Sequence, residues 1–267
     1  MNRHKLFGIH FDAITSSQAL ERLFSLAQSA KEKQLPAQLA VTVNVQIMVN
    51  ARRHFPALLR IINEAPLVVA DGAPLIFASR LFGPKLPERI AGSDLIYDIA
   101  KAASEKGLRL FFFGGEEKYT IQAMEKLKTL YPSLQIAGHA CPMVALNPND
   151  SQLAEEAEMC RQITNAKTDI LLVGLGCPKQ EFFVSRNAEK LKGMAAIGLG
   201  GTFNFLSGHI ARAPKWMQHM GLEWLFRIIQ EPKRLFMRYF IDAFFLAAYI
   251  LREPFRRYAE GKEERNS

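Results

Sequence analysis

The stretch DILLVGLG, residues 169–176, joins a short aliphatic run to a glycine-rich turn, which is typical of a buried parallel strand and the loop that follows it. Similar runs recur along the chain in both directions, separated by longer stretches with helical spacing. They cover residues 39–45, 67–70, 109–113, 134–137 and 194–199. This alternation predicts an α/β fold with an open, mostly parallel sheet and helices on both faces.

The residues that end each run are candidates for a site, because ligands of such sheets bind beyond the carboxyl ends of the strands. Gly114 and Gly115 end one run, and Gly174 and Gly176 end another. Glycine has no Cβ, so a backbone amide there can approach a phosphate closely, although an ordinary βα turn is the commoner explanation of any one pair. No strand is followed by GxGxxG or GxxxxGK[ST], which disfavours a dinucleotide oxidoreductase and a P-loop NTPase.

Polar side chains also stand at the strand ends. Asp71 follows residues 67–70 and can accept a proton from a sugar hydroxyl there, or it caps the next helix. Thr42 and Asn44 alternate with valines, so both point to one face and need partners from a substrate or from the protein.

Three further residues have the chemistry of anion or hydroxyl binding. Gln180 and Glu181 begin a predicted helix, whose first amides attract anions, and Arg89 is either a phosphate clamp or a surface charge. The sequence has no DxD pair and no His/Asp/Glu cluster with metal-ligand spacing, so no metal is predicted.

The chain changes character after Gly208. Residues 212–257 carry nine Lys/Arg against four Asp/Glu, which is most of the net charge of +8 and favours an anionic partner. The longest apolar run, residues 239–251, is shorter than the roughly 20 residues that a membrane span needs, but it can lie in the interface. We predict an α/β core over 1–208, a basic helical appendage over 209–259 that docks on an anionic membrane, and a disordered tail over 260–267.

Cysteine spacing and the first residues indicate the compartment. Three cysteines without CxxC spacing predict neither a disulfide framework nor a zinc site, and the N-terminus has no apolar stretch typical of a signal peptide. A cytoplasmic location, peripheral on the inner face of the membrane, is expected.

Taken together, the motifs resemble the bacterial N-acetylmannosaminyl and N-acetylmannosaminuronic acid transferases, the WecG/TagA/CpsF glycosyltransferases of cell-surface polysaccharide synthesis. The likeness runs in order through Thr42-Val-Asn44, Ala70-Asp71-Gly72, Glu88-Arg89-Ile-Ala-Gly92, Phe113-Gly114-Gly115, Val173-Gly-Leu-Gly-Cys-Pro-Lys-Gln-Glu181, Gly200-Gly-Thr-Phe-Asn-Phe-Leu-Ser-Gly208, Arg212-Ala-Pro-Lys-Trp216, Gly221-Leu-Glu-Trp224 and Glu231-Pro-Lys-Arg234. It implies transfer from a UDP-sugar to a polyprenyl-diphosphate-linked N-acetylglucosamine, with inversion, no cofactor and no required metal.

The resemblance also implies roles for individual residues. Asp71 is the expected general base. Around the sugars and the diphosphate we expect Thr42, Asn44, Arg89 and Gln180; at the donor Gly114, Gly115, Gly174, Gly176, Gln180 and Glu181; and at the acceptor diphosphate Arg227, Arg234 and Arg238.

The sequence leaves alternatives open. Another UDP-hexose, such as glucose or glucuronic acid, fits the same chemistry, and a non-catalytic scaffold of the pathway fits the same fold. A nucleic-acid-binding module is disfavoured, because the basic residues are interleaved with long aliphatic residues and no nucleic-acid-binding motif is found. The sequence does not determine the oligomeric state, and a homo-oligomer is one of the possibilities.

Overall fold

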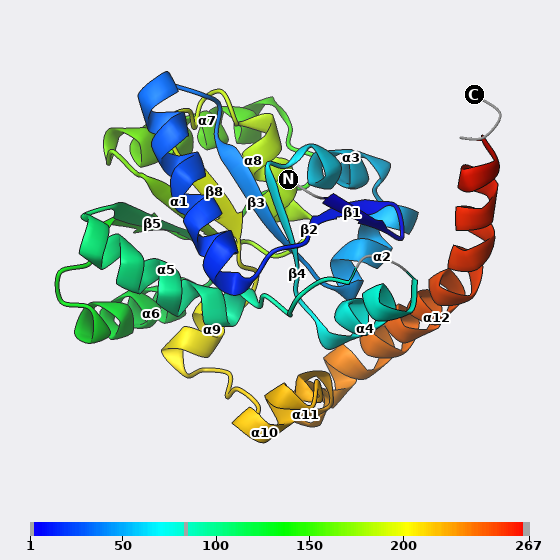
Figure 1. Cartoon of the computed structure of the whole chain (residues 1–267). Coiled ribbons are helices and arrows are strands. Elements are labelled where there is room, and N and C mark those ends of the chain that lie inside the picture. The colour runs from blue at the N-terminus through cyan, green and yellow to red at the C-terminus, as the bar shows by residue number, and fades with distance from the viewer. Residues whose placement is uncertain (1–2, 83–84, 264–267) are drawn as a thin grey trace.

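A six-stranded parallel sheet forms the centre of the computed structural model, in the order β4-β3-β8-β7-β5-β6 (Figure 1). The structure describes residues 3–82 and 85–263, without the side chains of residues 82, 219, 234 and 255–263. The strands are β3 (Gln38–Val43), β4 (Leu67–Ala70), β5 (Arg109–Gly114), β6 (Gln135–Ala140), β7 (Ile170–Gly174) and β8 (Ala195–Gly198). The predicted α/β class and parallel sheet are confirmed.

The central strands are buried on both faces, which explains their continuous apolar sequence. All four aliphatic residues of β7 are inaccessible to solvent, and Leu172 lies between Phe112 of β5 and Ile197 of β8. The edge strand β6 extends further than the predicted run 134–137, because residues 138–140 also belong to it. At Gly138 the ring of Phe111 lies 2.9 Å from where a Cβ would stand, so a larger residue would not fit unless the ring moved.

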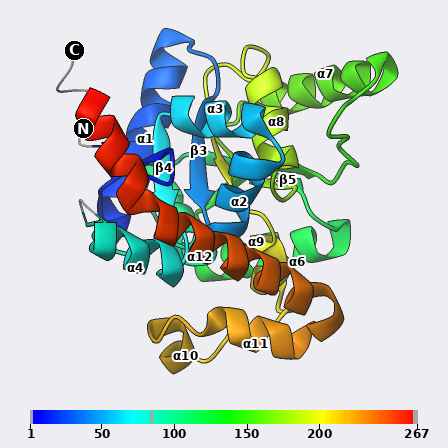
Figure 2. The ribbon, with the colours of Figure 1, turned by 90° about the vertical axis from the view of Figure 1, so that its right-hand side faces the viewer.

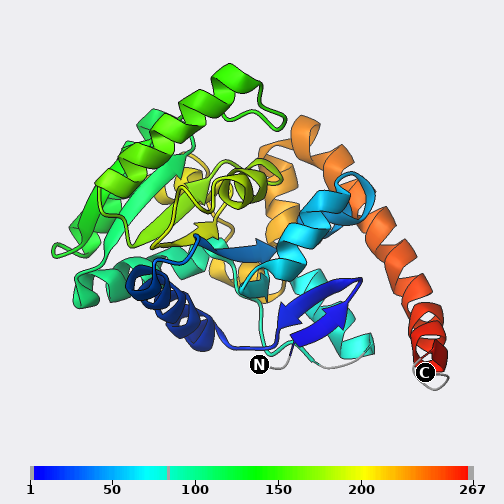
Figure 3. The ribbon, with the colours of Figure 1, turned by 90° about the horizontal axis from the view of Figure 1, so that it is seen from above.

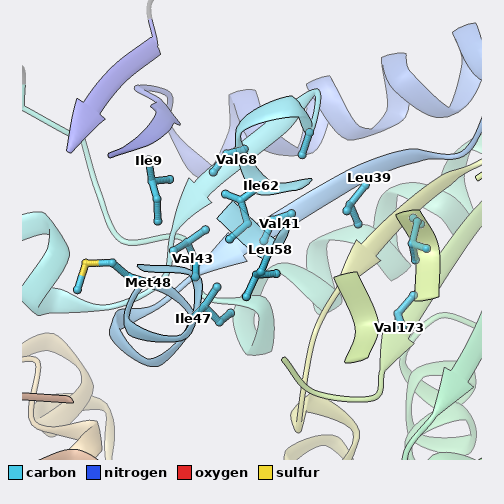
Figure 4. Packing of buried hydrophobic residues seen from close by; sticks show 14 of the residues in the cluster. Ile9, Leu39, Val41, Val43, Ile47, Met48, Leu58, Ile62, Val68 and Val173 are labelled. Atoms are coloured by element: carbon cyan, nitrogen blue, oxygen red, sulfur yellow. The ribbon is translucent and has the colours of Figure 1, made fainter. Parts of the chain in front are cut away.

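Helices cover both faces, as the alternating pattern predicts. One face is covered by α1 (Ser16–Lys33), α5 (Gly92–Lys106), α6 (Glu117–Leu130) and α9 (Thr202–Ser207). The other is covered by α2 (Val45–Arg53), α3 (Pro56–Glu64), α4 (Ala73–Phe82), α7 (Asp150–Asn165) and α8 (Lys179–Arg186). Between this second layer and the sheet pack Val41, Val43, Ile47, Met48, Leu58 and Ile62 (Figure 4).

A β-hairpin that the sequence analysis did not predict lies next to β4. Its strands are β1 (Arg3–Leu6) and β2 (Ile9–Asp12), which pair antiparallel. The buried carboxylate of Asp12 accepts a hydrogen bond from the backbone of Val68 at 2.8 Å and pairs with Arg3 at 3.1 Å. These contacts fasten the N-terminal residues to the sheet.

The C-terminal segment, residues 209–263, forms α10 (Lys215–His219), α11 (Glu223–Gln230) and α12 (Pro232–Glu263). The long helix α12 runs beside α2 and α4, and its last turns reach the outer edge of the molecule (Figures 2 and 3). Phe245, Leu246, Tyr249 and Ile250 pack on the core, and the guanidinium of Arg53 lies 3.8 Å from the ring centroid of Phe245. Among the described residues, no helix is long and apolar enough to cross a membrane.

The boundary of the predicted tail falls inside α12. This helix ends at Glu263, so residues 260–263 are helical, and residues 264–267 lie outside the described residues.

Candidate active site

A cavity of about 880 Å³ lies between the carboxyl ends of the strands and the C-terminal segment. On the core side it is lined by the ends of β3, β4 and β8 and by the first residues of α2. On the other side it is lined by α11 and α12. The predicted site residues that line it are Thr42, Asn44, Asp71, Arg89, Gly176, Gln180, Arg227 and Arg238. The fold therefore brings together residues that are up to 196 positions apart in the sequence.

Asp71 occupies the position expected of a base. It directly follows β4, and its backbone amide donates to the carbonyl of Val43 at 2.7 Å, which continues the strand pairing by one residue. Burial raises the pKa of Asp71 to about 6. The nearby carboxylates of Glu223 and Asp94 act in the same direction, whereas the Arg89 guanidinium lowers this pKa.

This raised pKa predicts a pH-dependent cost in stability. Between pH 4 and 6 the folded chain holds a proton on Asp71 that the unfolded chain has lost, so the free energy of unfolding falls as the pH rises through this range. We expect Asp71→Asn to be more stable than wild type by roughly 1–3 kcal/mol above pH 6.5, and no more stable below pH 4. Thermal unfolding across this range measures the difference, and a gain that does not depend on pH would contradict it. Asp98→Asn, at an exposed position of α5, controls for the loss of one negative charge.

Arg89 takes part in a charge network that joins the core to the C-terminal segment. Its guanidinium donates to Glu223 of α11 at 2.9 Å and to Asp94 of α5 at 3.3 Å. Arg212, between α9 and α10, pairs with the same two carboxylates, at 3.5 Å from Glu223. Asp94, Arg212 and Glu223 were not among the predicted site residues, since nothing in their local sequence indicates that they meet Arg89.

Thr42 and Asn44 find part of their hydrogen bonding within the protein. Thr42 Oγ1 donates to the carbonyl of Gly198 at 3.0 Å, and Asn44 Oδ1 caps α2 by accepting from the amide of Ile47 at 2.9 Å. The Asn44 Nδ2 group donates to no group among the described residues. Of the two polar side chains, Asn44 thus retains free hydrogen-bonding capacity at the cavity.

The amide of Gln180 is held in one orientation. Its Oε1 accepts from the amide of Gly200 at 3.0 Å, and its Nε2 donates to Glu181 Oε1 at 2.8 Å. Glu181 itself is completely buried and does not line the cavity, and burial raises its pKa. In this structure Glu181 is therefore placed to orient Gln180, and its predicted contact with the donor stays a prediction.

Of the predicted donor-binding glycines, Gly176 alone lines the cavity. A Cβ on Gly115 or Gly174 would come within 3.1 Å of the Phe203 ring of α9, and one on Gly114 would come within 2.8 Å of Leu175. Close packing explains these three glycines, and their donor-binding role stays a prediction.

Two arginines of the C-terminal segment line the cavity, each with one buried donor group that has no described partner. The Nε atoms of Arg227 and Arg238 are buried, and neither has a hydrogen-bond partner among the described residues. The Arg227 guanidinium lies 5.2 Å from the ring of Phe205, which limits its directions of approach. The side chain of Arg234 lies outside the described residues. A guanidinium group that lines a cavity with a free N–H donor is suited to bind phosphate.

The described part of the chain contains no group of three or more His, Cys, Asp or Glu that could hold a metal ion. Activity without a metal stays a prediction.

Many large apolar side chains are exposed on the C-terminal segment and on α4. They are Trp216, Met220, Trp224, Ile229, Phe236, Met237, Phe240, Phe244 and Leu251, with Phe77 and Leu81 of α4. Together these residues form the apolar face. Such a surface beside basic residues is typical of proteins that bind the interface of a membrane.

Comparison with known proteins gives the family. The model of the glycosyl transferase WecG/TagA/CpsF family matches residues 4–260. The chain is 31% identical over 194 residues to the N-acetylglucosaminyldiphosphoundecaprenol N-acetyl-beta-D-mannosaminyltransferase of Bacillus spizizenii, covering 73% of this chain and 72% of that protein. It is 27% identical over 230 residues to the enzyme of the same name from Staphylococcus aureus, covering 86% and 85%.

Proposed function

This chain belongs to the WecG/TagA/CpsF glycosyltransferase family, and we propose that it transfers N-acetylmannosamine or its uronic acid from a UDP donor to a polyprenyl-diphosphate-linked N-acetylglucosamine. The observation that carries the proposal is the cavity, which is lined by a carboxylate of raised pKa and by two arginines whose buried Nε atoms have no described partner. A base for a hydroxyl and cations for diphosphates are the groups that this reaction needs.

Asp71 acts as the general base of this reaction. The acceptor hydroxyl attacks the anomeric carbon of the donor and inverts it, and its proton passes to the Asp71 carboxylate. The bond from the anomeric carbon to UDP breaks, and its electron pair leaves with the diphosphate. A pKa of about 6 leaves Asp71 ionised at neutral pH while keeping it basic enough to accept a proton.

The remaining polar groups bind and orient the substrates. Arg89 and the oriented amide of Gln180 stabilise charge on the donor side. Arg227, Arg234 and Arg238 hold the acceptor diphosphate. Preorganised donors of this kind stabilise a developing negative charge without rearranging during the reaction.

The apolar face brings the cavity to a lipid-linked acceptor. Its tryptophan and phenylalanine side chains enter the headgroup region, and each nearby Lys or Arg adds about 1 kcal/mol of attraction to an anionic surface. The protein then works as a peripheral enzyme on the inner face of the cytoplasmic membrane.

A panel of donors tests the proposed function. The full chain, in mixed micelles with synthetic prenyl-diphosphate N-acetylglucosamine, is incubated with UDP-N-acetylmannosamine, its uronic acid, UDP-glucose and UDP-glucuronic acid. Release of UDP that requires the acceptor identifies the donor. Turnover only with UDP-glucose or UDP-glucuronic acid would mean that the donor sugar is not the proposed one. No turnover with any donor would favour a non-catalytic scaffold.

EDTA is expected to leave the rate of transfer largely unchanged, because arginine side chains take the place of a cation at both diphosphates. The measurement is UDP release with and without the chelator. Complete loss that magnesium or manganese restores would contradict a metal-independent reaction.

A further inference from the structure

A mostly buried acidic residue lines the cavity on the side of α12. Asp242 is 6% exposed and lines the cavity, although it interrupts the apolar run 239–251. No described group makes a hydrogen bond or a short ion pair with it, and Arg238 acts on it only through a longer-range charge interaction. The resemblance to known transferases assigned it no role.

Keeping such a group without a partner costs stability. Burial removes part of the hydration of this carboxylate, and it accordingly raises the pKa of Asp242 to about 6. The helix packs on the core through Phe245, Leu246 and Tyr249, so an apolar residue at position 242 would serve that packing better. A ligand that supplies hydrogen-bond donors in the cavity would satisfy the carboxylate.

The chemistry of the carboxylate and its place on α12 limit the kinds of ligand that Asp242 can bind. An ionised carboxylate only accepts hydrogen bonds, so it suits a hydroxyl or an amide N–H and repels phosphate. Arg238 lies four residues earlier, about one turn or 6 Å along the same face of the helix. A ligand whose diphosphate meets Arg238 therefore brings its attached sugar to Asp242.

We propose that Asp242 selects the acceptor sugar by accepting a hydrogen bond from one of its hydroxyls or from its acetamido N–H. This inference rests on the proposed function, because it takes the arginines of α11 and α12 to bind the acceptor diphosphate. Asp71 lines the same cavity from the opposite side, on the core. The acceptor sugar would therefore lie between Asp71, the proposed base, and Asp242.

The test combines acceptor analogues with Asp242→Ala and Asp242→Asn in the full-length protein. The acceptors are prenyl-diphosphate sugars: N-acetylglucosamine, glucose in its place, and the monodeoxy forms. For wild type we expect kcat/KM to fall about 10- to 100-fold for the one analogue that lacks the bonded group. With N-acetylglucosamine, Asp242→Ala should lower kcat/KM by the same factor. With the analogue that lacks the bonded group, the substitution should cause no further fall in kcat/KM, because the interaction is already absent.

Other measurements separate this inference from its alternatives. The KM for the UDP-sugar should stay unchanged; a rise in it would mean that Asp242 binds the donor and would overturn the inference. Equal losses for Asp242→Ala with every acceptor would also overturn it. Glu253→Gln, at a buried carboxylate of the same helix that does not line the cavity, is the matched control and should keep the wild-type preference among acceptors.

Binding measurements keep the test independent of turnover. Calorimetric titration of the same acceptors without donor yields the same comparison, and Asp242→Asn, which removes a buried charge at constant shape, provides a folded variant. If wild type transfers no sugar, the proposed function fails. The inference then stands or falls on whether Asp242 variants lose the binding preference among the acceptors.

Discussion

Asp71→Asn is expected to lower the rate of sugar transfer by roughly 10²–10⁴-fold, the usual contribution of a general base. The asparagine amide has nearly the same shape but cannot accept the proton of the attacking hydroxyl. Folding and UDP binding should be preserved, because the backbone pairing of residue 71 with Val43 does not involve the side chain. Acceptor-dependent UDP release measures the rate, and a titration with UDP measures the binding.

The pH dependence provides a second readout of the same residue. The carboxylate must be ionised to act, so kcat/KM of wild type should fall as the pH drops below the Asp71 pKa of about 6. The residual activity of Asp71→Asn should lack this limb of the profile. Wild-type turnover in the variant would remove Asp71 from the mechanism.

A chain that ends at Gly208 is expected to lose nearly all transfer to a lipid-linked acceptor and to stop sedimenting with anionic liposomes. The sheet is complete at β8, so circular dichroism should show a folded core. The truncated chain, however, lacks Arg227, Arg238 and Asp242 of the cavity. It also lacks most of the apolar face that would bind the membrane. Liposome co-sedimentation and UDP release measure the two losses.

The packing of α12 on the core affects the stability of the truncated chain. Phe245, Leu246 and Tyr249 cover part of the core, so the truncated chain should unfold at a lower temperature than the full chain. An aggregated or unfolded core would mean that the C-terminal segment is an ordinary packed subdomain. This result would contradict its role as a docking appendage.

Point substitutions in the full-length chain separate membrane binding from catalysis. Arg227→Ala together with Arg234→Ala should keep most liposome binding, since the apolar face remains, while transfer falls sharply. Equal losses of both would mean that these arginines serve the membrane surface and not the diphosphate.

Much of the core could be predicted from its sequence because its physics is local. A parallel strand buried on both faces needs a continuous apolar run, as at residues 170–173, and such runs mark the strands of the large sheet other than the edge strand β6, which is only partly buried. The hairpin β1–β2 gave no comparable signal, since its two four-residue strands are stabilised by Asp12 reaching Val68 and Arg3. Those contacts depend on how the chain folds back on itself.

The candidate site divides in the same way. The carboxyl ends of parallel strands meet at one edge, so the sequence by itself could place Thr42, Asn44 and Asp71 together once the strands were recognised. Only the tertiary structure decided that Glu223 pairs with Arg89, and that Asp242 enters the cavity. Those groups come from helices packed across the sheet edge, where side-chain proximity depends on the angle and register of packing rather than on any local pattern.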